Sequence, residues 1–171
     1  MEQNKEYKGL GGWLILVGIG VVIAPIKLLV TTVPVFNPIF TDGTWEVLTT
    51  VGTDAYSPIW APLLISEIIY NIAMFIALLY LVFLFFSKHY RFPVIYIIIL
   101  VIPLLFIPLD AWFVTLALPN EPMFDPETSK EFFRVLLTGL IWVPYMLISK
   151  RVKVTFVEKL PNKKTSLSDE S

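Results

Sequence analysis

Four ionisable side chains lie inside long apolar stretches of this sequence: Lys27, Glu67, Asp110 and Arg134. Placing a charge at the centre of a bilayer costs about 2.5–3.5 kcal/mol on insertion scales, so ionisable residues in such stretches are candidate functional residues. Asn71 follows Glu67 by four positions, which puts both on one face of a helix, where the amide can hold the carboxyl group or bond another helix. We therefore predict an intramembrane polar cluster made of these five residues.

The expected depths of these side chains indicate how their charges are balanced. A helix rises about 1.5 Å per residue, and counting from the ends of the apolar stretches puts all four ionisable residues in the outer half of the bilayer. We expect Asp110 to pair with Lys27 or Arg134, and Glu67 to pair with Lys27. Two acids and two bases then form a neutralised cluster.

Two interpretations of this cluster stay open. Either it forms a polar pocket that opens outward and binds an ion, a proton or a small polar ligand, or its members only join helices, with Lys27 and Arg134 extending to the headgroups. The structural interpretation is favoured for Lys27 and Arg134. Asp110 is equally suited to cap an outer helix that begins at Ala111. Glu67 is too short to reach the headgroups, which favours a functional role for it.

The residue inventory excludes several kinds of chemistry. The chain of 171 residues has no cysteine, which excludes disulfides, thiolate metal sites and a cysteine nucleophile, and its one histidine, His89, lies in a basic turn. Hydrolase, metalloprotease and nucleotide-binding motifs are absent from the sequence. We therefore expect no catalytic residues, no metal site and no cofactor. A net charge of −1 argues against binding of nucleic acid.

The elements that hold these residues are predicted to be membrane helices. The chain is 56% hydrophobic and only 16% charged, whereas soluble domains carry about 25% charged residues. Crossing a bilayer takes about 20 apolar residues, and each such segment must be helical because its backbone groups find no water to bond. We predict an all-α, integral membrane bundle of four transmembrane helices in a domain that covers residues 10–156. The spans cover residues 10–30, 59–86, 92–109 with an extension toward Leu118, and 132–148.

Lysine and arginine are distributed unevenly over the connecting segments. Basic residues gather in the N-terminal segment 1–9, in the turn between the second and third spans, and after the fourth span. The loop 31–58 has none, and the loop 119–131 has only Lys130. Because basic residues stay on the cytoplasmic side, both termini are predicted to be cytoplasmic. Lys150, Arg151 and Lys153 follow the last span directly and are expected to contact the anionic headgroups of the lipid bilayer.

Shorter segments carry further predictions. Residues 44–51 are expected to form a short interfacial helix in the first outer loop, after a turn at residues 41–44. Residues 152–156 alternate apolar and polar side chains, which is typical of an extended segment. Gly20 and Ala24 have the small-x-x-x-small spacing of closely packed membrane helices. The polar tail 157–171 lacks periodicity and is expected to be a disordered cytoplasmic segment.

Three stretches of the sequence form a recognisable pattern. The opening stretch is Gly-Leu-Gly-Gly-Trp-Leu at residues 9–14, and the middle one is Glu67 followed by Asn71. The closing stretch combines Trp-x-Pro-Tyr at residues 142–145 with Ser-Lys-Arg-Val-Lys-x-Thr-Phe at residues 149–156. Together they resemble a family of small bacterial inner-membrane proteins known as DUF2569. This resemblance covers residues 9–156 and implies a four-span protein of the bacterial inner membrane, with no particular activity.

Three functions are compatible with these observations, and the sequence favours them unequally. The most favoured is a non-enzymatic accessory or structural component of the membrane, which associates with a second copy of itself or with another membrane protein. The second is a small transporter or ion-coupled carrier in which Glu67 is the titratable residue. A membrane-embedded enzyme ranks last.

Overall fold

Four long helices make up most of the protein. The computed structural model describes residues 9–156, and this range contains helices and loops but no strand. Each long helix is long and apolar enough to cross a membrane, so the predicted all-α bundle of four spans is confirmed. The long helices are α2 (Trp13–Thr41), α4 (Trp60–Phe86), α5 (Phe92–Ala117) and α6 (Pro126–Ile148), and the short ones are α3 (Thr44–Thr49) and α7 (Lys150–Thr155).

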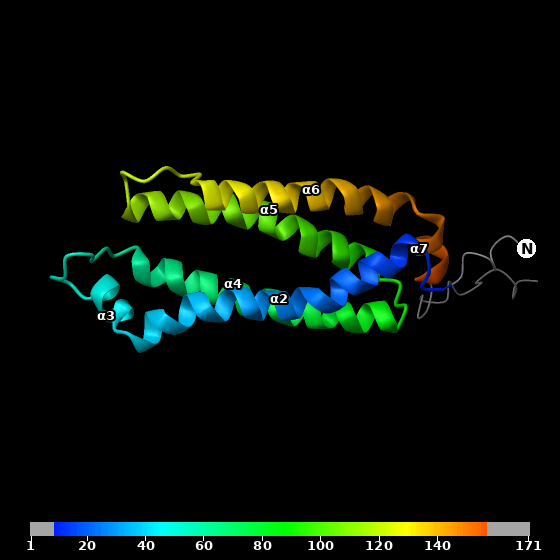
Figure 1. Cartoon of the computed structure of the whole chain (residues 1–171), viewed down its shortest axis with the longest axis horizontal. Helices are drawn as coiled ribbons and strands as arrows, with labels where there is room; N and C mark the ends of the chain where they lie inside the picture. The colour runs from blue at the N-terminus through cyan, green and yellow to red at the C-terminus, as the bar shows by residue number, and fades with distance from the viewer. Residues whose placement is uncertain (1–8, 157–171) are drawn as a thin grey trace, which may run out of the picture.

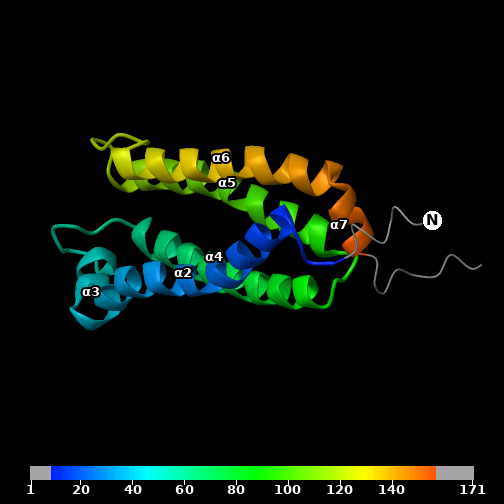
Figure 2. The ribbon, with the colours of Figure 1, turned by 45° about the vertical axis from the view of Figure 1, so that its right-hand side comes forward.

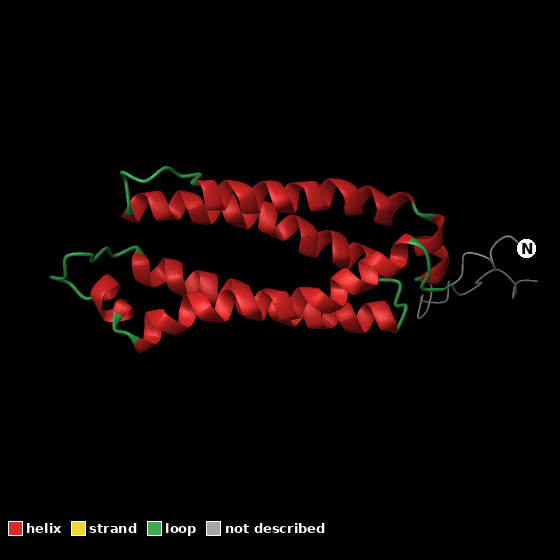
Figure 3. Ribbon diagram, viewed as in Figure 1, coloured by secondary structure: helices red, strands yellow, loops and turns green. Residues whose placement is uncertain are grey.

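The long helices are arranged as two antiparallel pairs (Figures 1 and 2). Helix α2 packs on α4, α5 packs on α6, and α4 also contacts α5, to which it is joined by the turn at residues 87–91. Helix α7 and the first described residues lie at one end of the bundle, and α3 lies at the other (Figures 1 and 3). We call these the α7 end and the α3 end. The two pairs lie closest together at the α7 end and separate toward the α3 end.

The buried core is concentrated at the α7 end. Phe156, which follows α7, stacks on Phe92 with ring centroids 4.4 Å apart, and its ring lies 5.9 Å from that of Phe85. Phe85 in turn packs against the backbone of Gly18 in α2, where a Cβ atom would lie only 2.7 Å from the ring. The buried core consists of Leu14, Val17, Val21, Leu78, Leu81, Leu84, Phe85, Phe92, Tyr96, Ile99, Met146, Val152 and Phe156.

A contact between the two ends of the described chain closes the α7 end. The backbone N–H of Gly9 donates to the Thr155 hydroxyl at 3.3 Å, and the same hydroxyl donates back to the Gly9 carbonyl at 3.2 Å. The Arg151 guanidinium covers Gly11, where a Cβ atom would lie 2.7 Å from Nη1. The opening and closing stretches of the sequence therefore meet in one structure, which we call the α7-end clamp and define by residues 9–11 and 149–156.

Helix α2 continues well beyond the predicted end of the first span. It ends at Thr41, so the predicted loop 31–58 begins with helix. Threonine side chains in this extension bond the helix backbone: the hydroxyl of Thr31 donates to the carbonyl of Lys27 at 2.9 Å, and that of Thr41 donates to the carbonyl of Asn37 at 3.0 Å. Such bonds satisfy the polar groups inside the helix, which is how threonine is tolerated in apolar surroundings. The short helix predicted after this segment is present as α3.

The last two spans also differ from the prediction at their ends on the α3 side. Helix α5 runs without interruption to Ala117, so Asp110 lies inside a helix and the prediction that it caps a new helix at Ala111 is wrong. Helix α6 begins six residues earlier than residue 132, because the Asp125 carboxylate caps it by accepting from the backbone N–H of Thr128 at 2.6 Å.

Two smaller predictions are wrong. Residues 150–155 form helix α7 instead of an extended segment, and the Ser149 hydroxyl caps this helix by accepting from Val152 N–H at 3.4 Å. The close packing predicted at Gly20 is absent, since a Cβ atom there would have no neighbour within 4 Å, whereas Ala24 does pack against the core and Gly18 contacts Phe85. The predictions for residues 1–8 and for the tail 157–171 lie outside the described residues.

Candidate functional site

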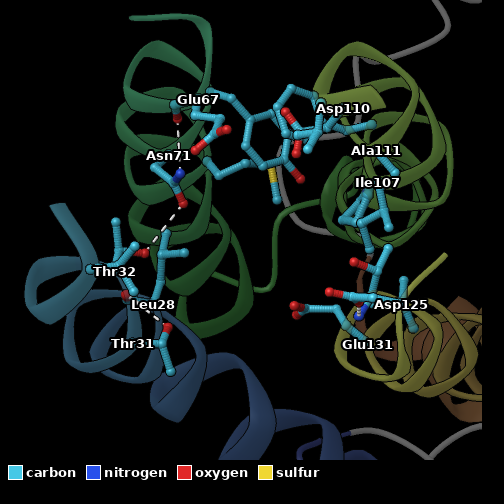
Figure 4. A pocket seen from close by; sticks show the side chains of 18 of the residues that line it. Leu28, Thr31, Thr32, Glu67, Asn71, Ile107, Asp110, Ala111, Asp125 and Glu131 are labelled. Carbon is cyan, nitrogen blue, oxygen red and sulfur yellow. Dashed lines mark hydrogen bonds between the residues drawn. The ribbon is translucent and has the colours of Figure 1, made fainter. Parts of the chain in front are cut away.

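A cavity of about 820 Å³ lies between the four long helices (Figure 4). Its innermost lining residues, which include Ala24, Leu78 and Pro103, border the core of the α7 end. Its outermost lining comes from the α5–α6 loop, at Glu121 and Met123. The cavity therefore begins in the middle of the bundle and opens at the α3 end.

All five residues of the predicted polar cluster line this cavity. Lys27 comes from α2, Glu67 and Asn71 from α4, Asp110 from α5 and Arg134 from α6. The cavity also has polar lining residues that the sequence analysis did not single out. For Thr31, Tyr70 and Glu131 the available signal was a position one helical turn from a predicted residue. These additional polar residues are Thr31, Thr32, Tyr70, Thr115, Glu121, Asp125, Thr128 and Glu131.

Two carboxyl groups face each other across the cavity. Figure 4 shows Glu67 on α4 and Asp110 on α5 pointing into the space between these helices. A direct hydrogen bond between two carboxyl groups would require a proton on one of them, because an ionised carboxylate can only accept. We call Glu67 and Asp110 the carboxyl pair.

An aromatic pair lies one helical turn deeper than the carboxyl pair. Tyr70 and Phe106 stack with ring centroids 3.6 Å apart and an angle of 3° between the rings. Tyr70 follows Glu67 by three residues on α4, and Phe106 precedes Asp110 by four on α5, so each ring shares a helix face with a carboxyl group. Because α4 and α5 run in opposite directions, both rings lie on the α7 side of the carboxyl pair.

Asn71 joins α4 to α2. Its amide donates to the backbone carbonyl of Glu67 at 2.8 Å, and its Oδ1 atom accepts from the Thr32 hydroxyl at 3.3 Å (Figure 4). Of the two roles predicted for this amide, bonding another helix is therefore the one observed, and holding the Glu67 carboxyl group is not. The Thr32–Asn71 bond also sets the register between the two helices.

This register separates Lys27 from the carboxyl pair. Thr32 is level with Asn71, Lys27 lies five residues deeper on α2, and Glu67 lies four residues nearer the α3 end on α4. At a rise of about 1.5 Å per residue, the Cα atoms of Lys27 and Glu67 differ in depth by about 13 Å. Lys27 forms no ion pair within residues 9–156. The predicted pairing of Lys27 with Glu67 or Asp110 is wrong because Lys27 lies deeper in the bundle than a count from the span ends indicates.

Arg134 also has a different partner from the one predicted. Its Nη2 atom lies 2.7 Å from Glu131 Oε1 on the same helix, and the two side chains are 51% and 57% exposed. The predicted pair with Asp110 is absent from the described residues. The positive charge of Arg134 is therefore already neutralised by Glu131 near the opening of the cavity.

The mouth of the cavity is acidic. Glu121, Asp125 and Glu131 line it, and Arg134 is the basic residue among them. Hydrogen bonds from Thr128 hold the pKa of Asp125 below its ordinary value, so this carboxylate is ionised at neutral pH. The described residues contain no group of three or more side chains able to hold a metal ion.

The three basic residues expected at lipid headgroups all lie in α7. Lys150 and Lys153 are exposed, whereas Arg151 is half-buried over Gly11. Arg151 therefore packs within the α7-end clamp. Contact of these side chains with anionic lipid stays a prediction.

Four helices able to cross a bilayer, with a polar cavity between them, define an integral multi-pass membrane protein. Residues 7–157 match the family described as "Protein of unknown function (DUF2569)". The chain therefore belongs to this family, as its opening and closing stretches suggested. No curated protein and no solved structure gives a significant match.

Proposed function

We propose that this protein is a non-enzymatic membrane component that binds a small polar ligand in the cavity between its four spans. One observation carries the proposal: polar or ionisable side chains from all four spans line a single cavity of about 820 Å³. Ligand sites in proteins are commonly clefts of roughly 300–1,000 Å³ with mostly apolar walls and a few polar groups. Polar side chains inside a membrane are energetically costly, so their presence there indicates a function.

The orientation of the chain is part of this proposal. Basic residues at the α7 end favour a cytoplasmic position for that end and for both termini. These residues include Lys88 and Arg91 in the α4–α5 turn, together with the exposed lysines of α7. The α3 end then faces outward, and the cavity takes up its ligand from the outer side. A bacterial inner membrane is supported by the family resemblance, and anionic headgroups at the α7 end are supported by its basic residues.

Cysteine labelling from outside the cell tests access to the cavity. The chain has no cysteine, so a single introduced thiol reports on one position. Ile107 lines the cavity, whereas Leu105 on the same helix is 71% exposed on the outside of the bundle, where lipid surrounds it. We expect a membrane-impermeant methanethiosulfonate to modify Ile107→Cys and to leave Leu105→Cys unmodified. Equal modification of the two, or none at Ile107→Cys, contradicts the proposal.

Ligand binding requires a second measurement on the intact protein. Cationic, anionic and zwitterionic solutes at millimolar concentration are added to the Ile107→Cys protein in nanodiscs, and the modification rate is recorded. A bound solute slows modification because it occupies the cavity. If no solute of any class slows modification or raises the melting temperature, the protein does not bind small polar ligands and the proposal fails.

Ion-coupled transport is the second candidate function. It is favoured by the arrangement of the spans, because the two helix pairs separate at the α3 end and are clamped at the α7 end. A carrier alternates this arrangement with one that is open at the opposite end. For a carrier we expect solute flux in proteoliposomes that Glu67→Gln abolishes at unchanged membrane abundance. No flux with the unmutated protein excludes the carrier and leaves ligand binding in place.

A further inference from the structure

The position of the carboxyl pair in the cavity leaves its negative charge without a fixed countercharge. Lys27 lies about 13 Å deeper on the helix rise, and Arg134 is paired with Glu131. Ionised carboxylates in such surroundings are strongly destabilised unless a cation or a proton accompanies them. Among the described residues no basic side chain forms an ion pair with Glu67 or Asp110, so a cation that enters from the mouth is the matching partner.

Apolar side chains border the carboxyl pair alongside the polar ones. The stacked rings of Tyr70 and Phe106 form the floor below it, and this stack holds α4 and α5 together. Walls at the same level and deeper come from hydrocarbon and thioether side chains, including Met74 and Ile107. A hydrated inorganic ion gains nothing from such walls, whereas the hydrocarbon part of an organic ion is stabilised by contact with them.

We propose that the ligand of this cavity is a small organic cation, whose ammonium group lies between Glu67 and Asp110 and whose apolar part rests on Tyr70 and Phe106. This inference rests on the proposed function and names its ligand class. The ammonium group donates hydrogen bonds to the two carboxyl groups or, if quaternary, is held by their charge alone. A divalent metal ion is a poorer fit, because the described residues offer no third carboxylate or imidazole beside the pair.

The charges along the cavity also favour a cation over an anion. Glu121 and Asp125 at the mouth attract positive solutes and repel negative ones, an effect that walls of low dielectric constant strengthen. Lys27, at the inner end, repels a cation that has passed the aromatic pair. The favourable position for an organic cation is therefore between these two regions, at the carboxyl pair.

The ligand class is tested by isothermal titration calorimetry, which measures the binding of three probes to the purified full chain in nanodiscs. The probes are benzyltrimethylammonium, its anionic counterpart benzenesulfonate and the neutral benzyl alcohol, which share the phenyl ring and differ in charge. We expect binding of benzyltrimethylammonium alone. Isosteric removal of either charge, in Glu67→Gln or Asp110→Asn, should weaken this binding at least tenfold. Asp54→Asn, in the α3–α4 loop and outside the cavity lining, should leave it unchanged.

A second readout avoids substitution of the carboxyl pair, in case those variants fail to fold. In the Ile107→Cys protein, benzyltrimethylammonium should slow cysteine modification and benzenesulfonate should not. Equal effects of the three probes, or full affinity in both carboxyl variants, overturn the inference. Binding of the anionic or neutral probe alone overturns the ligand class and leaves the proposed function standing. Absence of binding by solutes of every class overturns both.

Discussion

Replacement of Gly18 by alanine tests the packing that closes the α7 end. The added Cβ atom would lie 2.7 and 2.8 Å from two carbon atoms of the Phe85 ring, where ordinary contacts are 3.4–4 Å. The ring cannot move away freely, because Phe85 is only 3% exposed and contacts the rings of Phe92 and Phe156. Inserting a methylene-sized group into a packed core costs about 1–3 kcal/mol. Gly20→Ala is the matched control, since its Cβ atom meets nothing within 4 Å.

The comparison of the two alanine variants removes the effect of helix propensity. Both gain about 0.5–1 kcal/mol from replacing glycine in a helix, so their difference reports the contact with Phe85. We expect Gly18→Ala to be about 1–3 kcal/mol less stable than Gly20→Ala. The measurement is reversible unfolding in mixed micelles of increasing dodecyl sulfate content, followed by circular dichroism. Equal unfolding midpoints for the two variants refute the close packing at Gly18.

A double-mutant cycle identifies Phe85 as the neighbour responsible. In a Phe85→Leu background the ring is gone, so Gly18→Ala should cost little beyond the single leucine substitution. The coupling energy between the two sites is then expected to be about 1–3 kcal/mol, in the range found for residues in contact. Additive effects show that some other neighbour limits the space at Gly18.

Three further predictions concern hydrogen bonds and charges at the two ends of the bundle. Thr155→Val removes two hydrogen bonds to Gly9 and should lower stability in the same unfolding assay by about 1–3 kcal/mol. Thr155→Ser keeps the hydroxyl and should retain most of the stability. Equal losses in both variants contradict the role of the hydroxyl. Asp125→Ala removes the cap of α6 and should destabilise the protein at neutral pH. The folded-state pKa of Asp125 is lowered, so the stabilisation by this cap is fully present above the unfolded-state pKa of about 3.9. It disappears as the pH falls through the lower folded-state pKa. If the difference in melting temperature between Asp125→Ala and the unmutated protein does not change with pH, the carboxylate is not the source of this stabilisation. Arg134→Gln breaks an exposed ion pair with Glu131 and should change stability by only about 0–1 kcal/mol; a larger loss in the unfolding assay means that Arg134 has a further partner.

The four spans were predictable because a run of about 20 apolar residues has few alternatives to a membrane helix. The helix ends were less predictable, because hydropathy treats threonine and proline as loop residues. At Thr31 and Thr41 the hydroxyl groups bond carbonyls one turn earlier, and these bonds depend on the helix already being formed. The start of α6 is a different case. Asp125 followed by a proline is a recognisable helix start, which an estimate from hydropathy alone does not detect.

The members of the polar site were predictable, but their partners were not. Charge inside an apolar stretch was enough to select Glu67 and Asp110, and both line the cavity. The pairing of opposite charges failed because it depends on the relative depth of neighbouring helices. That depth is set by contacts such as the Thr32–Asn71 bond, which joins positions 39 residues apart and leaves no local pattern in the sequence.

The α7-end clamp has a consequence for the biogenesis of the protein. It joins Gly9 to Thr155, two residues separated by 146 positions, and it seats Phe156 on the rings of α4 and α5. During synthesis Gly9 is made long before Thr155, so the four spans can insert before the contact between these two residues forms. A chain that stops before residue 149 lacks Phe156, whose ring packs on those of Phe85 and Phe92. The α7 end can therefore reach its final packing only after residues 149–156 have been synthesised.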